Sequence, residues 1–502
     1  MFKNYLTVTF RSLLKHKAFS VINILGLTVG FTSCLLIGLY VQHEASFDKF
    51  QENRSRIARV IMEYGTEGSP EIRRGNYTST KVAPVFERTF PEVESAVRMV
   101  ERDVIVRNDN DLFSEPNFMF ADSTFFDIFS HSMLEGNPAK ALNGPFKVVV
   151  TSSTAERYFP GESPLGKTLL LGSEGKPYEV TGVIEDYPSN SQIQFDFLAS
   201  FSSLGVNQEE TYFDANYTTY LLLNDVLSFD ALQGKITSFM EKEMSGSGTF
   251  IDFILEPFDK IHLYSEYGGF VPNTSIVYLY VLTAVAFLIL VIVSFTYINL
   301  STARSVERAR EVGIRKVVGA GRAQLFWQFI GEAFLLCSLA VALSVNIVIM
   351  VLPWFNQLTA KSLQVGGLFT YSFIVTTALV TLIVSVAAGS YPSLILSRFQ
   401  PVKVLKGVFR NTGSGRLVQR SLIVFQFSIS VLMLVSTIVI QKQLHFIQNT
   451  KLGYEREHII ALPMNQKMIE NLSVIKSEFN AHPDIIGASR CANTPVQIAS
   501  GY

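Results

Sequence analysis

The sequence has few cysteines and few charges. Among its 502 residues there are three cysteines, Cys34, Cys337 and Cys491, and they lie far apart. This spacing fits neither a disulfide framework nor a zinc site. Charged residues make up 17% of the chain and the formal net charge is −1, so no overall positive charge indicates nucleic-acid binding.

Patterns that carry chemistry are also missing. His43, His445, His458 and His482 are scattered without the spacing of metal ligands, and no Ser/His/Asp or Cys/His set stands out. No small-residue cleavage site follows the basic N-terminus, so the first twenty residues are not a cleavable signal peptide. We therefore predict no catalytic, cofactor-binding or metal-binding residues, and a protein that is not itself an enzyme.

What the sequence does contain is long apolar runs, with 48% hydrophobic residues and a mean hydropathy of +0.27. A bilayer core requires about 20 apolar residues per helix. Five stretches meet this length, and we predict membrane spans at 19–41, 275–300, 324–352, 369–396 and 421–440. Residues 1–18 carry an apolar stripe at helical spacing with basic residues beside it, which predicts an amphipathic helix at the cytoplasmic face.

Residues 42–272 are polar by comparison and predict an α+β extracytoplasmic domain with a core of its own. The helices of this domain are expected at 80–89, 123–129, 152–158 and 228–244. Its strands are expected at 103–107, 147–151, 168–171, 178–184 and 217–223. The fold class is therefore an α-helical membrane protein with an α+β domain outside the bilayer.

Basic residues set the predicted orientation. The segments 1–18, 302–322 and 397–420 are rich in Lys and Arg, and the last has no acidic residue. The positive-inside rule places all three in the cytoplasm. The N-terminus is then cytoplasmic, and 42–272 and 441–502 lie outside a plasma (inner) membrane that the chain crosses several times.

Segment 302–322 is charged although a predicted span lies on each side of it. As a helix it would have one charged and one apolar face. The charged face would hold Arg304, Arg308, Glu311 and Arg315; the opposite face would hold Val306, Ala309, Gly313 and Val317. Such a helix can lie at the membrane surface and present its charges to a soluble partner. The alternative is an ordinary solvated loop that obeys the positive-inside rule.

Part of the chain repeats. Residues 91–98 (PEVESAVR) align with 483–490 (PDIIGASR), and the same shift of 392 positions brings the first span close to the fifth. A complete repeat would add a second outer domain and three more spans, which predicts that 441–502 is the truncated start of that second domain.

Several motifs resemble the MacB/FtsX-type permease subunits of ABC transporters. Residues 23–27 (NILGL) and 44–48 (EASFD) are similar to the N-terminus of the duplicated form found in Bacteroidetes-like bacteria. Residues 148–159, 164–167 (PLGK) and 180–183 (VTGV) look like the MacB-type periplasmic core domain. Residues 310–320 (REVGIRKVVGA) are similar to the family's cytoplasmic coupling segment, and 389–392 to the end of its fourth span.

This resemblance implies a permease that couples ATP hydrolysis by a separate cytoplasmic ATPase to motion of the outer domain, for efflux of a drug, peptide or lipoprotein. It implies ATPase-coupling residues at Arg304, Arg308, Glu311, Gly313, Arg315, Lys316 and Gly319. ATP is expected on the partner subunit, with no cofactor on this chain. The other implied partners are the lipid bilayer, a periplasmic adaptor or membrane-fusion protein, and a second half that completes a dimer or pseudo-dimer.

Two alternatives compete with this interpretation. The first is a non-transporting FtsX-like regulator of cell-wall hydrolases, which the large outer domain and the repeat disfavour. The second is a nucleotide site at 161–168 (GESPLGKT), which satisfies the GxxxxGK[ST] pattern. A helix is expected before this pattern and a strand after it, the reverse of a phosphate-binding loop, so we interpret it as a turn. Glu332, within the third span, is expected to pair near the interface or to pack against a helix.

Overall fold

The computed structural model describes residues 17–66, 71–108, 111–172, 174–206, 209–226, 228–303, 312–397, 413–450, 458–462, 464 and 466–491. Most of the predicted helix 1–18 and of the basic segment 397–420 lies outside these residues. Contacts within the chain divide it into two units, Met1–Val431 and Leu432–Tyr502, which are described separately.

Long apolar helices form the membrane part of the first unit. They are α2 (Lys17–Ala45), α9 (Ile276–Ala303), α11 (Arg322–Thr359), α12 (Tyr371–Ser397) and the first part of α14 (Gly413–Asn449). Within the described residues, five helical segments are long and apolar enough to cross a bilayer. The fourth span, predicted at 369–396, corresponds to α12, which continues through 389–392 to Ser397.

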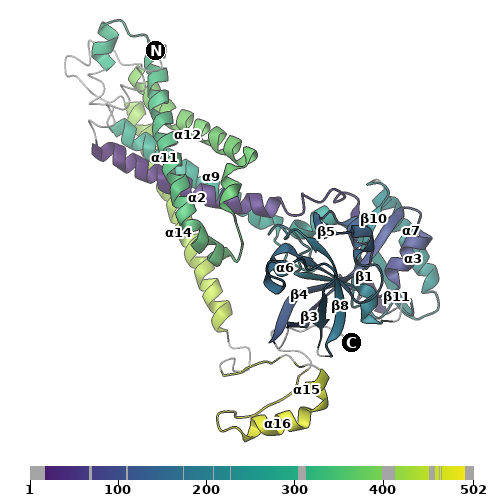
Figure 1. The fold of residues 1–502 in the computed structure, drawn as a ribbon. Helices are drawn as coiled ribbons and strands as arrows, with labels where there is room; N and C mark the ends of the chain where they lie inside the picture. The colour runs from purple at the N-terminus through teal and green to yellow at the C-terminus, as the bar shows by residue number, and fades with distance from the viewer. Residues whose placement is uncertain are drawn as a thin grey trace. The chain divides into compact units, whose positions relative to one another are not determined.

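The helices α2, α9, α11 and α12 pack against one another (Figure 1). Gly30 of α2 lets α9 come close, because a Cβ atom at Gly30 would lie 2.3 Å from Cγ2 of Val293. Nothing lies within 4 Å of the corresponding position at Gly26. The buried hydroxyl of Ser344 on α11 reaches the carbonyl oxygen of Thr28 on α2, 2.9 Å away. Close backbone approach and a polar interhelical contact are the usual means by which helices associate in lipid.

Residues 46–275, called the head here, join α2 to α9. Their strands form one mixed sheet, with the order β11-β1-β10-β3-β4-β9-β6-β8-β5 among the described residues; β2 pairs with β1, and β7 with β3 and β8. The strands are β1 (Ile57–Thr66), β2 (Arg73–Gly75), β3 (Val93–Asn108), β4 (Asp111–Ala121), β5 (Met133–Gly136), β6 (Lys147–Thr151), β7 (Thr168–Leu171), β8 (Lys176–Ile184), β9 (Phe197–Ser200), β10 (Thr218–Leu223) and β11 (Thr249–Pro257).

The first and last strands of the head are neighbours. β1 and β11 pair antiparallel along their whole length, from Ala58 opposite Pro257 to Thr66 opposite Thr249. Because β1 follows α2 and β11 precedes α9, the two membrane helices are attached at the same end of one strand pair. Buried Arg59 reinforces this end through hydrogen bonds to the Glu256 carboxylate and the carbonyl oxygen of Gly268.

Helices cover parts of the sheet and divide its core. The helices of the head are α3 (Val82–Thr89), α4 (Phe125–Ile128), α5 (Pro138–Ala141), α6 (Ser152–Tyr158), α7 (Ser228–Glu243) and α8 (Ile261–Tyr264). One core cluster joins α3 and α7 to β1, β10 and β11, and a second joins α6 to β4, β6, β8 and β9. In Figure 1, α3 and α7 lie beside β10 and β11, while α6 lies beside β4.

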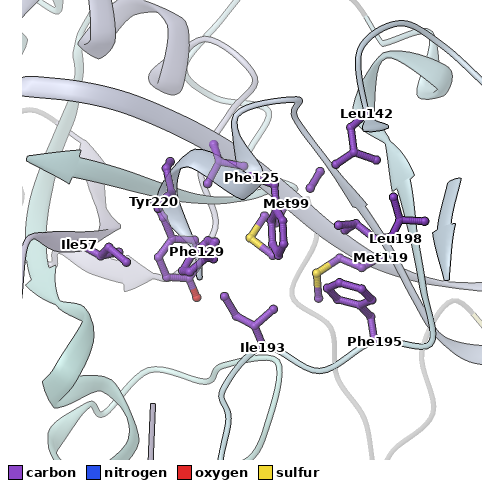
Figure 2. Close-up of a cluster of buried hydrophobic side chains, with 14 of the residues drawn as sticks. Ile57, Met99, Met119, Phe125, Phe129, Leu142, Ile193, Phe195, Leu198 and Tyr220 are labelled. Carbon is purple, nitrogen blue, oxygen red and sulfur yellow. The ribbon is translucent and has the colours of Figure 1, made fainter. Parts of the chain in front are cut away.

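A third core cluster contains the side chains shown in Figure 2. Phe129, Tyr220 and Met99 come from three different elements and point toward one another. Phe129 is 1% exposed, and its ring contacts the rings of Tyr220 and Phe258 edge-on or tilted. Truncating such a side chain to Ala costs about 3–5 kcal/mol, so this cluster stabilises the part of the head near α4 and α8.

Segment 161–168 forms a turn between α6 and β7. The N–H of Gly166 donates to the carbonyl oxygen of Val180, and Lys167 pairs with Glu162. The order helix, turn, strand confirms that the GxxxxGKT pattern here is a turn and not a phosphate-binding loop.

In the second unit, the described residues contain the rest of α14, α15 (Gln466–Glu470) and α16 (Leu472–Ala481). α16 ends two residues before Pro483, just as α3 ends two residues before Pro91. The two copies of the repeat therefore share a helix followed by a proline. They then differ, because 93–98 belong to β3 while the matching 485–490 are not in a strand. The duplication of the whole chain remains a prediction.

Candidate coupling sites

The described end of the predicted coupling segment is a helix followed by a tight turn. Residues 312–317 are helical, and Gly319 has a positive φ of 104°. The N–H of Ala320 donates to the carbonyl oxygen of Arg315, and that of Gly319 to Lys316. This pair of bonds is a Schellman motif, which ends a helix with a residue in the left-handed region, usually Gly. The sequence Val-Gly-Ala-Gly thus reverses the chain into α11.

The turn is packed on the start of α11. Val312, Leu325 and Phe329 form a small buried cluster, and Arg315 Nη1 donates to Oε1 of Gln328 over 2.7 Å. The Gln324 side chain accepts from the N–H of Gly321 and caps the helix. Helix 312–317 and the start of α11 are therefore held together by apolar and polar contacts.

The predicted coupling residues fall into two groups. Arg304, Arg308 and Glu311 lie outside the described residues. Of the others, Gly313 is buried, Arg315 and Lys316 are half-buried, and Gly319 is exposed in the turn. Burial, together with the nearby Arg322, lowers the pKa of Lys316.

In residues 312–318 the most exposed side chains are apolar. Ile314, Val317 and Val318 are 57%, 66% and 82% exposed, while Arg315 bonds to Gln328 on α11. Val317 was expected on the same apolar face as Gly313; here Gly313 is buried and Val317 is exposed. The sequence pattern alone could not show that α11 provides a hydrogen-bond acceptor for Arg315.

A polar contact joins α9 to α14 within the membrane part. Gln426 Nε2 donates to Oγ1 of Thr296 over 3.0 Å, and Asn299 Nδ2 donates to Oε1 of Gln426 over 3.3 Å. The rings of Phe295 and Phe425 pack beside it. Asn299 lies five residues before Arg304, so this contact adjoins the segment predicted to bind the ATPase.

A second cluster lies where α2 meets the head. Glu44, near the end of α2, is fully buried and accepts hydrogen bonds from Lys361 Nζ and His262 Nε2, each 2.8 Å away. Nδ1 of His43 is 3.4 Å from the same carboxylate. Lys361 thus pairs with the carboxylate and the two histidines contact it, which satisfies the general requirement that a buried charge be paired.

His262 is oriented from both sides of its ring. Its Nδ1 lies 3.1 Å from Nε2 of Gln192, so the amide donates to Nδ1 and the Nε2–H donates to Glu44. The ring of Phe47 stacks on the imidazole with a centroid separation of 3.4 Å. These contacts bring together the end of α2, the loop before β9 and α8, which precedes α9.

Asp48 anchors the next turn of the chain. Its Oδ1 accepts from Ser191 Oγ and from the Gln192 N–H, both at 3.0 Å, and its backbone N–H donates to Asn190. Burial raises the pKa of Asp48 to about 7, although these hydrogen bonds act in the opposite direction. Glu44 and Asp48 thus order the exit from the membrane. Both residues belong to the 44–48 motif of the sequence analysis, whereas His262 and Gln192 carry no motif and were not predicted.

Within the described residues, no group of His, Cys, Asp and Glu has the geometry of a metal site. Glu332 is 6% exposed within α11 and is engaged by a partner.

The fold and these sites define a class: a multi-pass membrane protein that carries an α/β head between its first two membrane helices. The model of the MacB-like periplasmic core domain matches residues 20–239, and the model of the FtsX-like permease C-terminal domain matches residues 283–401.

Relatives of known sequence agree with these matches. The uncharacterized ABC transporter permease YvrN of Bacillus subtilis is 23% identical over 445 residues, which cover 80% of this chain and 99% of that protein. The macrolide export ATP-binding/permease protein MacB of Escherichia coli K12 is 25% identical over 419 residues, covering 80% of this chain and 60% of MacB. MacB of Aggregatibacter actinomycetemcomitans is 23% identical, covering 65% of this chain and 49% of MacB. The chain thus spans nearly all of YvrN but about half to three-fifths of these MacB proteins.

Among solved structures, a domain of a putative permease from Porphyromonas gingivalis has 25% identity and a TM-score of 0.36, covering 41% of this chain and 91% of that domain. The periplasmic region of MacB from Actinobacillus actinomycetemcomitans has 16% identity and a TM-score of 0.29, covering 40% and 90%.

The chain belongs to the MacB/FtsX-type family of ABC transporter permeases. It is an integral protein of the inner membrane, and its family implies an ATPase partner.

Proposed function

We propose that this permease transmits motion from a cytoplasmic ATPase, bound at 302–322, to the head on the other side of the membrane, and that this motion drives export. The observation that carries the proposal is the continuity of the path. α9 leads from the head into the coupling segment, and the turn at Gly319 leads from that segment into α11.

The apolar face of 312–318 is the proposed contact with the ATPase. Ile314, Val317 and Val318 are exposed side by side at a turn held against α11. Exposed apolar side chains next to charged ones are typical of protein-binding sites. Arg304, Arg308 and Glu311 would provide the charged part of this interface.

Orientation is part of the same proposal. The basic segments place the N-terminus and 302–322 in the cytoplasm, with the head and 441–502 outside. A macrolide, a peptide or a lipoprotein would each suit an exporter of this family, and a periplasmic adaptor would complete its path. No observation favours the regulator of cell-wall hydrolases.

The test uses the permease copurified with its ATPase in lipid nanodiscs. Val317→Asp should reduce ATPase binding at least tenfold without altering permease folding, because it places a charge in the apolar contact. Lys242→Asp, an exposed change on α7 of the head, is the control and should bind normally. Normal binding by Val317→Asp and by the charge reversals Glu311→Lys and Arg315→Glu would contradict the proposal.

Orientation is tested with a membrane-impermeant maleimide. Ser245→Cys in the head should react in cells with an opened outer membrane, and Val318→Cys only after lysis. The reverse pattern would overturn the topology.

A further inference from the structure

The loop between α11 and α12 has one charge. In residues 360–370 this charge is Lys361, and the other residues of the loop are apolar or neutral. A lone cation in such a loop would normally extend into solvent. The Lys361 side chain is instead 19% exposed and points toward Glu44, where α2 meets the head.

Polar contacts attach this loop to α2 and to the head, and its Leu363 and Leu368 pack with Leu35 and Leu39 of α2. Gln42 Nε2 of α2 also donates to Oγ1 of Thr370 over 3.0 Å. Lys361 Nζ lies 2.8 Å from Oε1 of Glu44, and 5.7 Å from the centroid of the Phe47 ring. The hydroxyl of Ser189, in the head, donates to the carbonyl oxygen of Ser362 over 3.3 Å. The loop therefore touches the same cluster in which α2 and the approach to α9 meet.

The chemistry of this contact suits an attachment that opens and closes. A buried ion pair adds little net stability compared with an apolar pair of the same size. When the two charged groups separate, hydrogen bonds to water replace the ones that they lose. When an apolar contact separates, apolar surface is exposed to water and nothing offsets this cost. Glu44 also keeps its hydrogen bond from His262 when Lys361 moves away, so the buried carboxylate is never without a donor.

We propose that Lys361 is a positioning residue: by binding Glu44 at the end of α2, it holds the α11–α12 loop against His262 and Ser189 of the head. We call this releasable contact the latch; it adds to the two covalent connections of the head. The inference rests on the proposed function, because α11 follows directly from the segment that the ATPase would move. When the latch is closed, motion of α11 and α12 is transmitted to the part of the head that adjoins α2 and α9. When it is open, the head is held by α2 and α9 alone.

The first experiment measures the position of the head against the loop. Maleimide spin labels at Ser245→Cys and Gln357→Cys report this distance in the permease–ATPase complex, in a Cys491→Ser background, with and without ATP and vanadate. Lys361→Met should broaden the nucleotide-free distance distribution, while Lys242→Met, on the exposed side of α7, should not. A Lys361→Met distribution identical to that of the unmodified residue, with and without nucleotide, would overturn the latch.

The second experiment holds the latch shut. Ser189→Cys and Ser362→Cys are added to the variant of the first experiment. They are oxidised to a disulfide, and the spin labels are attached afterwards. The disulfide should abolish the distance change that ATP and vanadate produce, and a reductant should restore it, since the thioether labels survive reduction. An unchanged shift in the oxidised protein would contradict a releasable attachment.

The two proposals fail differently. If the complex does not form, or if its nucleotides never move the head, the proposed function fails. The nucleotide-free comparison of Lys361→Met with Lys242→Met still tests the latch in that case.

Discussion

Nε2 of His262 donates to Oε2 of Glu44 over 2.8 Å, joining residues 218 positions apart in the chain. One ends the first membrane helix, and the other lies shortly before the second. Both membrane connections of the head thus meet at one carboxylate.

The first prediction concerns the charge of Glu44. Glu44→Gln should destabilise the head by about 1.5–3 kcal/mol, because the hydrogen bonds from Lys361 and His262 lose their charged acceptor. Glu52→Gln, at an exposed position a few residues on, should change stability by less than about 0.5 kcal/mol. Thermal unfolding of the two variants in detergent measures the difference, and equal melting temperatures would refute the role of the cluster.

The second prediction concerns pH. Burial raises the pKa of Asp48 to about 7 in the folded protein, from a value near 4 in the unfolded chain. The folded state therefore binds more protons in this interval. The stabilisation that protonated Asp48 gives the folded state is fully present below pH 4 and is lost as pH rises through 7. The free energy of unfolding falls by about 4 kcal/mol at most over this interval.

Asp48→Asn separates this effect from the nearby histidines. The variant keeps an acceptor for Ser191 and Gln192 but cannot ionise. The stability of the natural protein should fall relative to that of the variant between pH 5 and 8. Parallel stability curves over this range would show that Asp48 does not titrate there.

The third prediction concerns the approach of α2 to α9. Gly30→Ala should separate the two helices, because the added Cβ would meet Val293 at 2.3 Å. Gly26→Ala, one turn earlier and with nothing within 4 Å, should be neutral or stabilising by up to about 1 kcal/mol. Melting temperatures of both variants provide the measurement, and equal behaviour would mean that the helices do not approach closely at Gly30.

The fourth prediction concerns the contact between α9 and α14. Thr296→Val and Gln426→Leu, alone and together, should give a coupling energy of about 0.6–1.7 kcal/mol, the range measured for interhelical hydrogen bonds in membranes. Ser428→Ala is the control, since this hydroxyl bonds within its own helix. Strict additivity of Thr296→Val and Gln426→Leu would argue against the contact.

Much of the head could be predicted from local pattern. The strands expected at 147–151 and 168–171 and the helix expected at 152–158 are confirmed residue for residue, because β-branched runs and short polar helices carry strong local signals. β1 and β11 were missed. Their pairing partner lies nearly 200 residues away, and each contains charged residues that weaken the strand pattern.

The sites were less predictable. Glu44 lies in the 44–48 motif, but its pairing with Lys361 depends on how α2 and α11 pack together and was not predicted. His262 had no motif at all. The hydrogen bond of Arg315 likewise depends on Gln328, which belongs to the next helix. Long-range contacts of this kind leave no periodicity in the sequence.

The pairing of β1 with β11 limits how the head can be driven. Both membrane connections leave from the end where Ala58 faces Pro257. Pulling α2 and α9 apart would break the hydrogen bonds between β1 and β11 one after another, starting at this end, and would open the sheet at low force. Moving α2 and α9 together, along the strand axis or as a tilt, strains no single hydrogen bond. The strand pair therefore favours motions in which the two helices move together.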